Sequence, residues 1–123
     1  MAGAACGIAQ RRRSVNYEND LQTRGEQRVL ACLLQRNEAL CHCMNLTPCH
    51  FSHDQHGMIF RAIRALLSQG RVADEWSVFA FLREVYPRYH VSSVYLIALR
   101  HMAVHTSNCG YYASKLQHAG DRP

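Results

Sequence analysis

The sequence lacks the signature motifs of the common catalytic sites. It contains no G-x-x-x-x-G-K-[ST] loop to cradle nucleotide phosphates, and no G-x-S-x-G, H-E-x-x-H or G-x-G-x-x-G pattern. Its 9 acidic residues are scattered, so that no pair of them suggests an acid–base couple. We therefore expect no enzymatic activity of the chain on its own and no cofactor.

Long apolar runs are also missing. No stretch approaches the roughly 18 apolar residues that a membrane-spanning helix requires, so no contact with a membrane is expected. Residues 1–10 are too short and too weakly apolar for a secretory signal. The 6 cysteines are then expected to be reduced, in a cytoplasmic protein.

Strand and hairpin signals are absent, whereas apolar residues recur at helical spacing. The first predicted helix begins near Gly25, buries an apolar stripe within residues 29–34 and leaves Glu26 outside. Asn37 breaks that run, and a second short helix is expected to follow it as far as Leu46. The predicted fold is all-α, a compact bundle of about six short helices.

Turn and cap residues delimit the middle of the chain. Thr47-Pro48 predicts an N-cap followed by a tight turn. Ser52 and Gln55 fit an S-x-x-Q capping box that would begin the next helix. Gly70 stands where a left-handed C-terminal cap would end that helix.

Three further helices are expected in the second half. Asp74 is the predicted N-cap of the first of these helices, and Pro87 is expected to end that helix. Another is predicted over residues 92–104, with Val94 among its candidates for burial, and a last one follows Asn108.

The sequence divides into a flexible basic leader at 1–22, a helical domain at 23–119 and a short tail at 120–123. The net charge is +5, and its one dense cluster is Arg11-Arg12-Arg13 in the leader. Such a cluster favours nucleic acid, although a solvated basic surface gives the same pattern. DNA binding by Arg11, Arg12 and Arg13 is therefore an alternative function.

A cluster of cysteine and histidine residues raises the possibility of a zinc site. Cys41, Cys43, Cys49 and His53 could supply four ligands across a helix–turn–helix. The spacing is not one of the common zinc-finger spacings, and residues 41 and 43 point to different faces of a helix. Core or surface packing is the favoured explanation of these residues, so no metal is expected, and a zinc-stabilised structural domain is the second alternative.

Aromatic residues crowd the predicted helix that follows Asp74. Phe81 suits the core stripe, which leaves Trp76 and Phe79 as candidate anchors for a protein partner, unless neighbouring loops cover them. Arg61 and Arg64 are further candidate partner-binding residues. With Arg71 they could face phosphates instead, although arginines three positions apart on a helix usually form a solvated face.

The order of these elements resembles the N-terminal domain of DnaB-type bacterial replicative helicases. The resemblance covers residues 25 to about 118. Six segments carry the resemblance, in the same order as in the family. The family stretches are EAEQSVLGGLLLDNE, LSPDDF, HRAIF, LYAEGEPVDLVTV, YLAEL and NIxxYAxIV, and the similar segments of this chain are 25–38, 46–51, 56–60, 65–74, 96–99 and 108–116. At His56, within HRAIF, a side chain that caps or packs inside is expected.

The chain also departs from the family pattern. Residues 86–90 replace a Gly-rich segment, Cys49-His50 replaces an acidic pair, and bulky aromatics stand at Trp76 and Phe79. We expect the helical hairpin, the linker and the ATPase domain of a full helicase to be absent.

The resemblance implies a module for protein–protein interaction in DNA replication. In the family the N-terminal domain is not the motor but contributes to ring assembly and to contact with primase or with the helicase loader. The expected partners are therefore a replicative helicase, a primase or a loader, with self-association possible and DNA contacted weakly or indirectly. Competition with helicase assembly is a further possibility.

Overall fold

Residues 21–121, which the computed structural model describes, fold into helices joined by turns. The elements in chain order are α2 (Leu21–Gln35), η2 (Asn37–Cys43), η3 (Pro48–His50), α3 (Asp54–Ser68), α4 (Glu75–Val85), α5 (Ser93–Arg100), η4 (Thr106–Asn108) and α6 (Cys109–Asp121), where η denotes a 3₁₀ helix. The all-α prediction is confirmed. Within these residues no helix has both the length and the apolar character that crossing a membrane requires.

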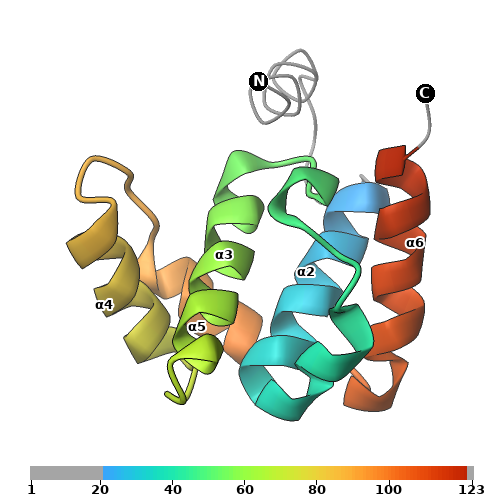
Figure 1. Cartoon of the computed structure of the whole chain (residues 1–123), viewed down its shortest axis with the longest axis horizontal. Coiled ribbons are helices and arrows are strands. Elements are labelled where there is room, and N and C mark those ends of the chain that lie inside the picture. Colours follow the sequence, from blue (N-terminus) through green and yellow to red (C-terminus); the bar gives the residue numbers. More distant parts are fainter. Residues whose placement is uncertain (1–20, 122–123) are drawn as a thin grey trace.

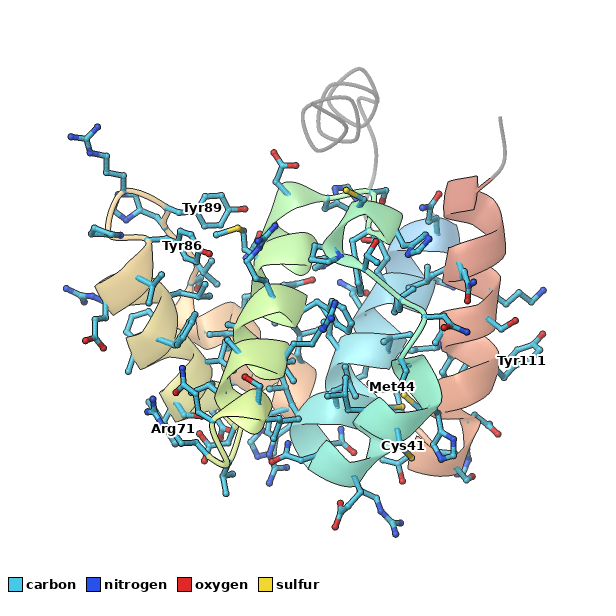
Figure 2. All side chains as sticks on the ribbon, viewed as in Figure 1. Cys41, Met44, Arg71, Tyr86, Tyr89 and Tyr111 are labelled. Carbon is cyan, nitrogen blue, oxygen red and sulfur yellow. The ribbon has the colours of Figure 1, made fainter. Side chains whose placement is uncertain are left out.

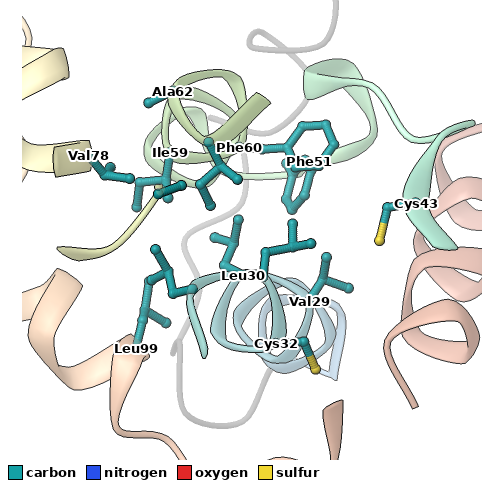
Figure 3. Packing of buried hydrophobic residues seen from close by; sticks show 14 of the residues in the cluster. Val29, Leu30, Cys32, Cys43, Phe51, Ile59, Phe60, Ala62, Val78 and Leu99 are labelled. Atoms are coloured by element: carbon teal, nitrogen blue, oxygen red, sulfur yellow. The ribbon is translucent and has the colours of Figure 1, made fainter. Parts of the chain in front are cut away.

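Helix α2 lies at the centre of the bundle. Residues 29–34 are all buried, which means that the helix is enclosed on every side rather than on one face. It packs against α6, α5, α3 and η2, and Figure 1 shows it between α3 and α6. The core residues of α2 and α3, including Leu30, Ile59 and Phe60, meet in Figure 3.

Helix α4 lies at the edge of the bundle in Figure 1, where it packs against α3 and α5. Only Val78 and Leu82 of α4 are fully buried. The rest of the helix is partly or wholly exposed, because no third element covers it among those that the structure describes. This edge position matters for the candidate interaction surface below.

The two caps between α3 and α4 are as predicted. Gly70 has a φ of +75°, the left-handed conformation that ends α3, and the amide of Arg71 then bonds to the carbonyl of Leu66 at 2.9 Å. Asp74 caps α4 through Oδ1, which accepts from the amides of Trp76 at 3.0 Å and Ser77 at 2.8 Å. The Thr47-Pro48 turn is also confirmed, as η3.

The predicted capping box at Ser52 and Gln55 is wrong. Helix α3 begins at Asp54, with His53 in the N-cap position and no side-chain cap. Ser52 is buried, and its hydroxyl makes no hydrogen bond within the described residues, whereas its amide donates to a side chain of α2. A tertiary contact has overridden the local motif.

Three other expectations need correction. Helix α2 begins at Leu21 rather than near Gly25, and α5 ends at Arg100 rather than near residue 104. Val94, expected to be buried, is 73% exposed, because the inward face of α5 is formed by Leu96 and Leu99 instead. Glu26, expected outside, is fully buried.

Two glycine substitutions should change stability in opposite directions. Gly70→Ala should lower the free energy of unfolding by about 1 kcal/mol, because a side chain is strained at positive φ. Gly25→Ala should raise it by about 0.5–1 kcal/mol, because alanine favours the interior of a helix, and the added Cβ would lie 3.7 Å from Leu116. Urea denaturation followed by circular dichroism measures both; equal signs would contradict the assignment of Gly70 as the cap.

Candidate functional site

A buried carboxylate in the middle of the bundle holds three segments together. Glu26 on α2 accepts two hydrogen bonds, one at each oxygen. Its Oε1 lies 2.7 Å from Nδ1 of His56 on α3, and its Oε2 accepts from the amide of Ser52 at 2.5 Å. Glu26 and His56 are both almost completely buried, so this pair is shielded from solvent screening.

The network continues from His56 to α5. Nε2 of His56 lies 2.6 Å from the hydroxyl of Tyr95, which also accepts from Nε2 of Gln27 at 2.9 Å. An ionised carboxylate only accepts hydrogen bonds, so Nδ1–H of His56 donates to Glu26.

A second pair lies beside this network. Nε2 of His53 is 2.7 Å from the hydroxyl of Thr23, a buried residue one turn before Glu26. The rings of His53 and His56 meet edge to face, with centroids 5.3 Å apart. We name Thr23, Glu26, His53, His56 and Tyr95 the α2 clamp. Since its central carboxylate is closed to solvent, the clamp fastens α2 to α3 and α5 rather than presenting an acid–base pair to a substrate.

The four residues considered as zinc ligands do not converge. Cys41 and Cys49 are exposed, whereas Cys43 is buried with its sulfur 3.3 Å from that of Cys109, and His53 belongs to the α2 clamp. Among the described residues no three side chains of cysteine, histidine, aspartate or glutamate form a group able to hold a metal ion. These four residues are close in the sequence, but in the described part of the chain they do not form one metal site.

The candidate partner-binding aromatics lie on α4 and differ in exposure. Trp76 is 62% exposed, and Val72, in the segment before α4, is 66% exposed. Phe79, one turn further, is partly buried against the core and carries the guanidinium of Arg83 5.7 Å from its ring centroid. We name Val72, Trp76, Phe79 and Arg83 the α4 face.

The two candidate arginines of α3 occupy different surroundings. Arg61 lines an apolar groove of about 730 Å³, together with Met58 and residues 86–89, between α3 and the segment after α4. Figure 2 shows Tyr86 and Tyr89 of this groove at one end of α3 and α4. Arg64 lies over the ring of Phe60 and reaches the carbonyl of Leu46 at 3.5 Å. Arg64 thus faces the segment between η2 and η3.

The remaining predicted site, Arg11 to Arg13, lies outside the described residues, as does most of the expected leader. The groups that sequence reasoning missed are Glu26 and Tyr95. Glu26 stands four residues before Leu30 and seven before Leu33, on the side of α2 that packs inward, so its helical position carried a signal that its charge concealed.

Known proteins share the helical fold of this chain. The family described as DnaB-like helicase N terminal domain matches residues 19–118. The crystal structure of the N-terminal domain of DnaB helicase from Mycobacterium tuberculosis superposes with a TM-score of 0.71 at 31% sequence identity, covering 82% of this chain and 72% of that one. No curated protein matches.

These matches concern the N-terminal domain of the helicase and not its catalytic ATPase domain. The family match spans all the elements from α2 to most of α6, including the α2 clamp and the α4 face. The resemblance seen in the sequence is therefore confirmed: the chain belongs to the DnaB-like helicase N-terminal domain family.

Proposed function

We propose that this chain serves DNA replication as a protein-interaction module that contacts a replicative helicase, a primase or a helicase loader, and that it catalyses no reaction itself. The family relationship supports a role linked to a replicative helicase. The α4 face supports contact with a protein partner. Because the chain carries the fold of a helicase's own N-terminal domain, it can also compete for positions in helicase assembly.

The observation that carries the proposal is the exposure of Trp76. Its indole is 62% exposed and belongs to α4, the helix at the edge of the bundle. Tryptophan and arginine are enriched among the few residues that dominate binding energy at interfaces, and the α4 face holds one of each. Burial of the indole by a partner removes this apolar area from water.

The groove beside α4 supports the same interpretation. Its wall is formed by Met58, Tyr86, Pro87 and Tyr89, and its two cationic groups are Arg61 and Arg88. An apolar side chain can enter such a groove while a neighbouring carboxylate pairs with a guanidinium. The groove therefore suits an apolar anchor flanked by acidic residues on the partner.

Trp76→Ala should weaken binding to the partner at least about tenfold, because removal of a central aromatic anchor typically costs 2 kcal/mol or more. The measurement is size-exclusion chromatography with light scattering to find which of a DnaB-type helicase, a primase and a loader co-elutes, followed by calorimetry on that pair.

Tyr111→Ala is the matched control. Tyr111 is also 62% exposed, but it lies on α6, at the opposite side of the bundle from α4. This variant should bind as the unaltered chain does. A chain that co-elutes with none of the three proteins would refute the interaction module, and equal losses in both variants would refute the α4 face as its site.

A further inference from the structure

Three cysteines from distant parts of the sequence meet in the core beside α6. Cys32 comes from α2, Cys43 from η2 and Cys109 from the first turn of α6, and all three are buried. The sulfurs of Cys43 and Cys109 are 3.3 Å apart, whereas the thiol of Cys32 donates to the carbonyl of His105 at 3.9 Å. Figure 3 shows Cys32 and Cys43 on the side of the core next to α6.

Burial and the neighbouring thiols shift the pKa values of the three cysteines in different directions. The bond to Cys109, together with burial, raises the pKa of Cys32 far above its ordinary value. The bond from Cys32 lowers the pKa of Cys109, but the bond to Cys43 and burial outweigh it and raise that pKa to about 12. The bond from Cys109 lowers the pKa of Cys43 despite burial. Cys43 is therefore the sulfur that most readily becomes a thiolate, the nucleophilic form.

The backbones that carry Cys43 and Cys109 also approach each other closely. A Cβ added to Gly110 would lie 3.3 Å from Cβ of His42, so the residues that adjoin the two cysteines are nearly in contact. The sulfurs of Cys43 and Cys109, 3.3 Å apart, need to approach by only about 1.3 Å to reach the S–S distance of about 2.0 Å in a disulfide.

We propose that Cys43 and Cys109 are a redox modification site, at which a hydroperoxide converts the two thiols into a reversible disulfide that fastens η2 to the start of α6. The Cys43 thiolate attacks the peroxide oxygen, which gives a sulfenic acid and, with hydrogen peroxide, hydroxide. The Cys109 thiol then displaces the hydroxyl group of the sulfenic acid. In sum, two thiols and one hydrogen peroxide give one disulfide and two waters, the sulfurs losing the two electrons that the peroxide gains.

Access to the buried pair is expected through η2. This short 3₁₀ helix carries the exposed Cys41 and ends next to the exposed Met44, so its outer side faces solvent. Short 3₁₀ segments have poorer hydrogen-bond geometry than α-helices, which favours local opening. Opening of η2 exposes Cys43, and its return places the oxidised sulfur against Cys109.

The test is oxidation of the whole chain with hydrogen peroxide, followed by alkylation and peptide mapping under non-reducing conditions. We expect a peptide pair joined through Cys43 and Cys109, with the loss of two hydrogens in the intact mass. Because the bond closes a long loop between η2 and α6, the melting temperature should rise by about 10 °C and return to its starting value after reduction.

The variants Cys43→Ala and Cys109→Ala should abolish both the linked peptide and the rise in melting temperature. Cys41→Ala and Cys49→Ala are the controls, because these cysteines are exposed and should leave the product unchanged. Mapping of the unaltered chain keeps the test valid if a core variant folds poorly. A disulfide between other cysteines, or further oxidation of Cys43 to sulfinic acid without a linked peptide, would overturn the proposal.

Discussion

Replacement of Glu26 by alanine should lower the free energy of unfolding by about 3–6 kcal/mol, because two hydrogen bonds to a buried carboxylate are lost, each worth about 1.5–3 kcal/mol. The substitution leaves Nδ1–H of His56 and the amide of Ser52 without their acceptor in the interior. Since a domain of this size is stabilised by only about 5–15 kcal/mol in total, much of its stability is lost. Denaturation in urea, followed by circular dichroism, measures the effect.

Glu38→Ala is the matched control for Glu26→Ala. The side chain of Glu38 is 80% exposed, and its ion pair with Arg36 is at the surface, so its removal should change little. Glu26→Gln should fall between the two, because the amide keeps one acceptor oxygen but turns an NH₂ group towards the second donor. A loss below about 1 kcal/mol in Glu26→Ala would show that the α2 clamp does not hold the three segments together.

The clamp shows where sequence reasoning ends. Charged residues are almost never fully buried unless they are paired, so Glu26 was expected outside. Its partners, Ser52 and His56, are 26 and 30 residues away, and no local pattern reveals such a pairing. The burial of His56 was expected from the family resemblance, whereas the identity of its partners was not.

Helix caps were predicted correctly from the sequence where all the groups that form the cap lie within a few residues of one another. Asp74 behaves as predicted because its side chain needs only the amides of the next three residues to cap the helix. Gly70 behaves as predicted because its role as a cap needs only its own positive φ. Ser52 failed as a cap because its amide is engaged by Glu26, on another helix. The ends of α2 and α5 differ from the prediction because helical periodicity does not fix helix ends.

The cysteines illustrate the same limit for sites. Spacing suggested grouping Cys43 with Cys41 and Cys49, whereas the fold places Cys43 against Cys109, 66 residues later. Contacts of this kind arise from the packing of η2 against α6, which a single sequence does not display. By contrast, the exposure of Trp76 was an open alternative from the sequence, because one face of the helix cannot bury all its aromatics.

Phe60→Ala should lower the free energy of unfolding by about 3–5 kcal/mol, the range for truncation of a buried phenylalanine to alanine. Phe60 is fully buried and packs against Phe51, with ring centroids 5.1 Å apart, so its removal leaves a cavity beneath the segment that contains η3. The amides of His50 and Phe51 donate to the carbonyls of Thr47 and Pro48. In Phe60→Ala their hydrogen exchange should therefore become faster, relative to the amides of α6, than it is in the unaltered chain.

Phe79→Ala tests whether the effects of Phe60→Ala are specific to Phe60 or follow from the loss of any aromatic ring. Phe79 packs against the core from α4 but stays partly exposed, so its truncation removes less buried area and should cost less than half as much. Hydrogen exchange at residues 48–51 should not change in this variant, because α4 packs on α3 and α5 and not on η3. If both variants lost equal stability, or if Phe60→Ala left exchange at residues 48–51 unaltered, the packing of Phe51 on Phe60 would not be what holds η3 against α3.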